Sequence, residues 1–312
     1  MKLKTIFWTI LALLGAYGGY WYYMAYHAED FVGKRLKAMQ AVGFHANYDS
    51  LDVSGFPYRL IVSLNNADIR FEHNGTQIRM TTPQFNMAVQ PWNYKHVIVN
   101  AEDNALSIST HALGEVLAIQ PALIRMSMNT TDGRPFRMSL ELKDVALPGN
   151  NNRAERINLH ILEGQNGDNG SQGALLEPAL ATIMLAIDGL SANGTGIMSK
   201  GQVTMVPRGS AMPKWTAEGL ATWRDEGGTL DVTSLSIKGV NEGESLDAEG
   251  SLALDEMLRP MGALTVTSRG NGPVADMLPG QGERSDGLLL MDGVVLLGTE
   301  QVGVSKPVLP RN

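Results

Sequence analysis

The stretch Ser54-Gly55-Phe56-Pro57-Tyr58-Arg59 holds the densest group of residues suited to binding a ligand. The Arg59 guanidinium offers a planar fork of donors that suits a phosphate or carboxylate. The same stretch also suits a structural bend, because Gly55 permits unusual backbone angles and Pro57 is confined to sheet edges or bulges. The sequence favours the bend. Trp92 and Trp223 could likewise serve a ligand, by stacking on it, or a structure, by being buried in a β-rich core. Burial is favoured.

The chain shows no residue pattern typical of catalysis or metal binding. Its six histidines form no H-E-x-x-H motif and no i, i+4 pair, so the spacing gives no support for a zinc site. There is no G-x-S-x-G, Walker or dinucleotide-binding glycine pattern. The absence of cysteine excludes a thiol nucleophile and a disulfide framework. We therefore expect a protein that is not an enzyme and that needs neither a metal nor a cofactor.

The N-terminal segment gives the clearest indication of location. Residues 5–26 carry no charge, and as a helix they match the roughly 30 Å thickness of a hydrocarbon core. The alternative is a cleaved signal peptide, but its best cleavage point, after Ala28, has a bulky Tyr26 at position −3. The aromatic block at 20–23 suits a membrane interface. We expect an uncleaved, single-pass anchor in the inner membrane.

Charge supports an orientation for this anchor. Lys2 and Lys4 precede it and Glu29 and Asp30 follow it, which predicts a cytoplasmic N-terminus and a periplasmic bulk of the chain. These two lysines belong to the 25 basic residues, so residues 27–312 set 23 basic against 32 acidic groups. A negative domain without a basic cluster argues against nucleic acid as a partner.

Periodicity predicts a mainly β protein beyond the anchor. Residues 28–42 have helical spacing and end before Gly43. From Phe44 onward, apolar residues alternate with polar ones, and turn signals recur every 8 to 12 residues, as in antiparallel meanders. Asn74-Gly75 and Asp292-Gly293 predict tight hairpins. The fold class expected is antiparallel β, as curved sheets or a sandwich, with a few short helices and one N-terminal transmembrane helix.

The domain organisation follows from these changes of pattern. We expect an anchor at 1–26, a helical connector at 27–43 and a β-region at 44–163. The glycine-rich loop 164–173 separates this region from a second β-region at 174–312, although the two could form one continuous domain. Residues 175–190 suit either a helix or an apolar strand, and a strand over 180–187 is favoured.

Several short motifs together resemble one known family. They are the G-F-P-Y-R stretch, Pro91-Trp92 followed by His96, Trp223 with Gly227-Gly228, and a final strand pair at 293–298 before Pro307. The chain resembles the alphaproteobacterial domain-of-unknown-function family 2125, whose members are membrane-anchored envelope proteins. The resemblance implies a β-rich fold and an envelope location, and it supplies no catalytic residues. The layout is also similar in style to AsmA-like envelope proteins that handle lipids.

These observations predict a non-enzymatic scaffold that is attached to a membrane and binds lipid or another envelope component. A structural role as an assembly partner of envelope proteins is the alternative. Hydrolysis of an envelope polymer is the least favoured possibility. The residues retained as a ligand-binding or structural motif are Gly55, Phe56, Pro57, Tyr58, Arg59, Trp92 and Trp223.

Overall fold

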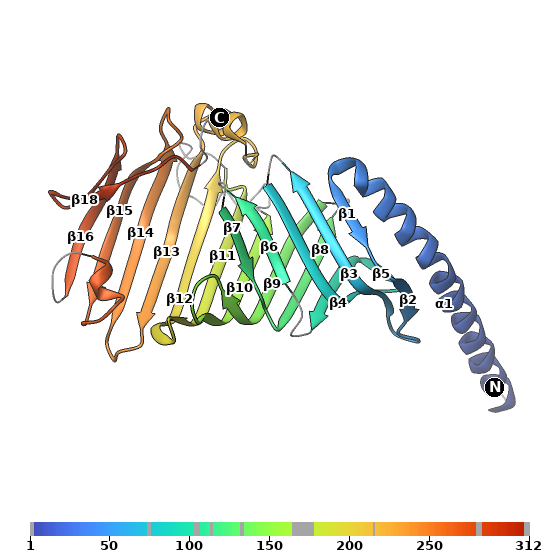
Figure 1. Cartoon of the computed structure of the whole chain (residues 1–312). Coiled ribbons are helices and arrows are strands. Elements are labelled where there is room, and N and C mark those ends of the chain that lie inside the picture. Colours follow the sequence, from blue (N-terminus) through green and yellow to red (C-terminus); the bar gives the residue numbers. More distant parts are fainter. Residues whose placement is uncertain are drawn as a thin grey trace. The chain divides into compact units, whose positions relative to one another are not determined.

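The computed structural model describes residues 3–73, 76–102, 107–112, 115–131, 134–163, 178–214, 216–278 and 283–308. Antiparallel strands dominate it, which confirms the predicted fold class (Figure 1). The chain divides into two compact units. Unit 1 comprises Met1–Ala112 and Val116–Gly133, and unit 2 comprises Leu113–Glu115 and Arg134–Asn312.

Unit 1 begins with the long helix α1 (Leu3–Met39) and the 3-10 turn η1 (Gln40–Val42). The helix predicted over 28–42 is confirmed, and it is continuous with the uncharged stretch before it. Gly43 follows with a φ of 82°, a left-handed angle that glycine adopts readily at the end of a helix. Within the described part of the chain, no helix combines the length and the apolar character needed to cross a membrane.

The sheet of unit 1 is built on a long hairpin of β3 (Leu60–His73) and β4 (Thr76–Gln90). The hairpin predicted at this point is confirmed by the strand pairing, while Asn74 and Gly75 lie outside the described residues. Two short strands, β1 (Phe44–Asn47) and β2 (Ser50–Ser54), pair with successive halves of β3.

On its other side, β4 pairs with β5 (Asn93–Glu102) and β6 (Ser107–Ala112), and β5 pairs in turn with β8 (Leu123–Thr131). The short strand β7 (Glu115–Ile119) lies between β6 and β8 in the chain.

Helix α1 covers part of one face of this sheet. Its buried residues Trp21, Ala28 and Val32 pack against Leu60 and Val62 of β3. A second cluster lies further along β3, where Leu64, Ala67 and Ile69 pack with side chains from β1 and β4. The core of unit 1 is therefore a sheet face that is partly covered by the C-terminal half of α1.

In unit 2, ten described strands follow one another as a simple antiparallel meander, each paired with the next in the chain. They are β9 (Arg134–Leu147), β10 (Asn152–Glu163), β11 (Ala181–Ala192), β12 (Thr195–Arg208), β13 (Thr229–Gly239), β14 (Ser245–Leu254), β15 (Pro260–Arg269), β16 (Arg284–Met291), β17 (Val294–Leu297) and β18 (Glu300–Val304). The strand favoured over 180–187 is confirmed by β11. The loop 164–173 lies outside the described residues, and the strands on either side of it, β10 and β11, pair directly.

Two short helical pieces accompany these strands. Helix α2 (Ala217–Asp225) begins after Thr216, which caps it by accepting the Gly219 backbone N–H. The other piece is the 3-10 turn η2 (Ala275–Met277). Val274 and Leu278 beside this turn pack on Leu246, Ala248 and Val266 of the sheet.

Candidate functional site

The G-F-P-Y-R stretch forms a tight loop before β3, at the end of the sheet that α1 crosses. Gly55 has a φ of 102°, and a Cβ at this position would lie 2.8 Å from the Arg59 carbonyl oxygen. The Arg59 N–H donates to the Gly55 carbonyl at 3.0 Å, and the Phe56–Pro57 bond is cis. Only glycine fits such a turn without strain. The backbone of the stretch therefore has the geometry of the predicted bend.

Helix α1 holds this loop through its aromatic side chains. The Trp21 indole N–H donates to the Arg59 carbonyl at 2.9 Å, and the Tyr17 hydroxyl donates to the Pro57 carbonyl. The Phe56 ring lies 5.3 Å from the Trp21 ring, edge to face. The side chains of Tyr58 and Arg59 are exposed. The carbonyls of Pro57 and Arg59 thus accept hydrogen bonds from α1, whereas the exposed side chains of Tyr58 and Arg59 remain available to a ligand.

The two tryptophans of the predicted set have different environments. Trp92 is 59% exposed in the turn between β4 and β5, beside Pro91, whose carbonyl accepts the Tyr20 hydroxyl at 3.1 Å. Because Leu60 pairs with Val89, this turn and the G-F-P-Y-R loop lie at the same end of the sheet. Trp223 in α2 is buried, and its indole N–H donates to the Arg208 carbonyl at 3.0 Å. Its contacts are those of a structural anchor in unit 2.

Unit 2 carries a wide apolar surface that spans its sheet. In an antiparallel pair, directly opposed residues lie on the same face. The register therefore aligns apolar side chains into rows that cross strand after strand. One row is Leu140, Leu159, Leu185, Val203, Leu235, Ala248 and Val266. A parallel row is Met138, Ile161, Ile183, Met205 and Val232, and another is Leu142, Ile157, Ile187, Gly201, Ile237 and Leu246. We call these three rows the apolar face of unit 2.

The side chains of this face are incompletely buried over β9 to β12. Among those four strands, Leu142 is buried, whereas the other apolar-face side chains from Met138 to Met205 are only half-buried. Over β13 to β15, by contrast, Val232, Leu246 and Val266 are at most 8% exposed, and the last two lie under the η2 segment. At about 4.8 Å between strands and about 6.8 Å between rows, the open part of the face over β9 to β12 covers roughly 200 Å². It is a contiguous apolar patch of moderate size for a soluble protein.

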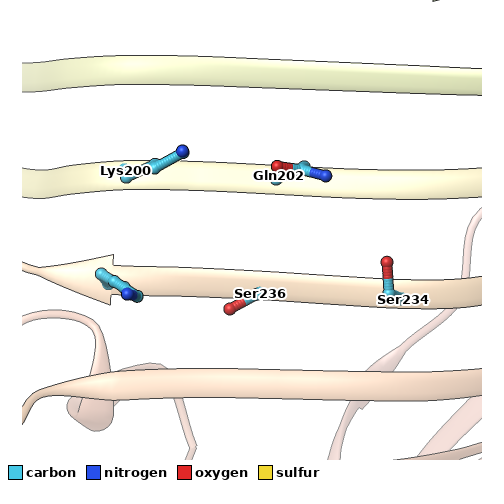
Figure 2. Close-up of a pocket in the computed structure, with 5 residues that line it drawn as sticks. Lys200, Gln202, Ser234 and Ser236 are labelled. Atoms are coloured by element: carbon cyan, nitrogen blue, oxygen red, sulfur yellow. The ribbon is translucent and has the colours of Figure 1, made fainter.

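The opposite face of the same strands is polar. A hollow of about 240 Å³ on this face is lined by Lys200 and Gln202 of β12 and by Ser234, Ser236 and Lys238 of β13. Figure 2 shows Lys200 and Gln202 on one strand, with Ser234 and Ser236 on its neighbour. Lys200 is directly opposite Lys238, and within the described residues neither ammonium group forms an ion pair. The hollow is suited to weak contact with an anionic group.

The described residues supply no catalytic constellation in either unit. They contain no group of three or more His, Asp or Glu side chains placed to hold a metal ion. The described residues include two serine–histidine hydrogen bonds, both at 2.9 Å: a part-buried one between Ser127 and His96 and an exposed one between Ser139 and His160. Each is a cross-strand pair, and within the described residues no carboxylate is hydrogen-bonded to either histidine.

Comparison with known protein families gives one match. A family model described as "Uncharacterized protein conserved in bacteria (DUF2125)" matches residues 21–307. The chain belongs to the DUF2125 family. This membership confirms the family resemblance inferred from the short motifs. The DUF2125 match includes the G-F-P-Y-R loop, Trp92, Trp223 and the whole apolar face of unit 2. No curated protein and no solved structure matches the chain.

Sequence reasoning did not identify the apolar face as a candidate site. The alternation of apolar residues was visible in single strands, such as Ile183, Leu185 and Ile187. Alternation alone cannot show which strands are neighbours or in which register they pair, and one residue of slip turns every side chain to the other face. The pairing of Leu159 with Leu185, and of Leu185 with Val203, supplies that missing information.

Proposed function

We propose that this protein is a non-enzymatic, membrane-attached scaffold of the cell envelope that binds the acyl chains of lipids on the apolar face of unit 2. The observation that carries the proposal is the set of half-buried aliphatic side chains in the middle of β9 to β12. Leaving such side chains in water costs about 25 cal/mol for each Å² of apolar surface. An acyl chain lying across the strands would remove that cost without requiring any polar group.

The character of the face supports a lipid rather than a small polar ligand. The first and third rows hold only aliphatic side chains, alanine and glycine. The second row adds only Met138 and Met205, and none of the three rows holds an aromatic ring. Binding of this kind is non-directional and tolerates variation in the ligand, which suits acyl chains of different length. The polar headgroup would remain in water beyond the rows of aliphatic side chains.

The N-terminal turns of α1 support attachment to a membrane. Beyond the part that packs on the sheet, residues 5–16 carry no charge, and large apolar side chains project on every side of the helix. Phe7, Trp8, Leu13 and Leu14 are each more than 60% exposed. A helix that is apolar all round needs an apolar environment. Together with Lys4 and the acidic residues that follow, this supports the predicted inner-membrane location with both units in the periplasm.

Photocrosslinking of the full chain tests the lipid site. A benzophenone amino acid is placed at Leu185 on the apolar face or, as the matched control, at Ala186, the next residue of β11, on the polar face. Each variant is produced in bacterial cells, irradiated in the membrane fraction and analysed by mass spectrometry. Because neighbouring residues of a strand point to opposite faces, the Leu185 variant is expected to yield lipid adducts and the Ala186 variant few or none.

The outcomes separate the proposal from its alternative. Lipid adducts at equal yield from both positions, or from neither, would overturn acyl-chain binding on this face. A protein adduct from the Leu185 position, without lipid, would instead support the assembly-partner function. A second apolar-face position, Leu159, with His160 as its control on β10, guards against a local effect of the probe at Leu185.

A further inference from the structure

We propose that five aromatic residues at one end of unit 1, Tyr20, Tyr22, Phe56, Tyr58 and Trp92, form a collar that seats the sheet on the surface of a lipid bilayer. The partner is the headgroup region of the membrane, and the collar would fix how far the chain enters it. This inference rests on the membrane attachment in the proposed function. It adds that two loops of the sheet also contact the membrane.

The collar is assembled from three separate segments that meet at one end of the sheet. Tyr20 and Tyr22 belong to α1, Phe56 and Tyr58 to the loop before β3, and Trp92 to the turn after β4. The Tyr22 and Phe56 rings are stacked with their centroids 6.3 Å apart. The Tyr20 hydroxyl donates to the carbonyl of Pro91, the neighbour of Trp92. These contacts tie the helix to both loops.

The exposure of the five rings is unusual for aromatic side chains. Tyr58 is 73% exposed, Tyr22 69%, Trp92 59%, Phe56 53% and Tyr20 42%. Aromatic rings with polar tips are favoured where hydrocarbon meets water, because the ring is apolar and the hydroxyl or indole N–H can bond to headgroups or water. Arg59 follows Tyr58 in its loop, and Lys95 lies near the start of β5, three residues after Trp92. Both are exposed, so positive charge is available to anionic headgroups.

The course of α1 agrees with this placement. From Trp21 onward the helix packs along β3, with Ala28 and Val32 further from the collar, and its C-terminal end is near β1. Its N-terminal turns, Leu3 to Ala16, extend past the loop-bearing end of the sheet (Figure 1). At 1.5 Å per residue they extend about 21 Å beyond the collar. A bilayer that receives those turns therefore brings its surface to the level of the five rings.

Depth-dependent quenching in vesicles tests the collar. The chain contains no cysteine, so single cysteines can be labelled without background. The fluorophore NBD is attached to full-length Tyr58→Cys, Trp92→Cys, Leu13→Cys and His45→Cys proteins, reconstituted in vesicles of phosphatidylethanolamine and phosphatidylglycerol. His45 is the matched control: it is exposed in unit 1 and pairs with Arg70, ten residues from Leu60, which places it roughly 33 Å along β3 from the collar. Nitroxide lipids carry the quencher either near the headgroup or deep in the acyl chain.

The collar predicts that the shallow nitroxide quenches the labels at Tyr58 and Trp92 several-fold more than the label at His45. The label at Leu13 is expected to be quenched most by the deep nitroxide. If Leu13 is quenched while Tyr58 and Trp92 match His45, the collar is overturned and membrane attachment stands. If Leu13 is not quenched either, membrane attachment itself fails. Equal shallow quenching at His45 and Tyr58 would also overturn the collar, because the whole sheet would then lie on the membrane.

Discussion

At the scale of single residues, Glu244 organises the loop that covers part of the apolar face. It is 3% exposed, and its Oε1 accepts the backbone N–H of Val274 at 2.6 Å and that of Ala275 at 3.2 Å. Its Oε2 accepts the N–H of Asn241 at 3.4 Å. A buried carboxylate with several donors stabilises a loop mainly because those donors have no other partner.

We expect Glu244→Ala to lower the thermal unfolding midpoint by about 5 °C or more, since the donors left unsatisfied cost about 1–3 kcal/mol. Glu242→Ala, at an exposed position of the same loop, serves as the control and should shift the midpoint by about 1 °C or less. Melting curves followed by circular dichroism in a mild detergent measure both. Equal shifts in the two variants would contradict the role assigned to Glu244.

Asp68 supplies a pH-dependent contribution to the stability of unit 1. Hydrogen bonds from the Arg70 guanidinium, then from that of Arg79, lower the pKa of Asp68 from 3.8 to about 2. A lowered pKa in the folded state stabilises the protein above the unfolded value, and this stabilisation is lost as the pH falls from about 4 to about 2. Because both guanidinium groups are half-exposed, we expect Asp68→Asn to cost only about 1 kcal/mol at pH 7.

Urea unfolding of the Asp68→Asn protein at pH 7 and at pH 2 measures this difference. The variant should be clearly less stable than the parent at pH 7 and nearly as stable as the parent at pH 2, where the folded-state Asp68 carboxyl is about half protonated. Glu29→Gln removes an exposed acid of α1 that forms no ion pair with any described residue, and it should change little at either pH. A destabilisation by Asp68→Asn that persists at pH 2 would show that the effect does not come from the ion pairs.

At the scale of elements, the docking of α1 on the sheet depends on Trp21. This side chain is 5% exposed, donates to the Arg59 carbonyl and contacts the Phe56 ring. Trp21→Ala removes a buried aromatic group worth about 3–5 kcal/mol. We expect hydrogen exchange of the Leu60 and Val62 amides to accelerate on the order of 100-fold. Tyr26→Ala, at an 81% exposed position of the same helix, should leave these rates unchanged.

The same elements show which parts of the fold the sequence patterns can predict. Helical spacing over 28–42, the Asp292-Gly293 hairpin and the alternation from Phe44 onward were sufficient to predict α1, the β16–β17 turn and the mainly β class. The proximity of Trp92 to the G-F-P-Y-R loop could not be predicted, since it depends on the pairing of Leu60 with Val89 across a long hairpin.

At the scale of the whole molecule, each unit leaves apolar surface exposed. In unit 1 this surface lies on the projecting turns of α1, and in unit 2 on the half-buried rows over β9 to β12. A ligand that binds only the folded chain and covers such surface stabilises it.

Because the apolar face belongs to unit 2, lipid should stabilise the two units unequally. A ligand at 100 times its dissociation constant adds about 2.7 kcal/mol, which slows exchange by global unfolding about 100-fold. We expect this protection at the amides of Leu159, Leu185 and Val203 after addition of a short-chain phosphatidylglycerol, with no change at Val62 or Leu64 in unit 1. Leu185→Asp should abolish the gain, while Ala186→Asp, on the polar face, should retain it. Equal protection of both units would mean that the lipid stabilises the whole chain nonspecifically and does not bind the apolar face.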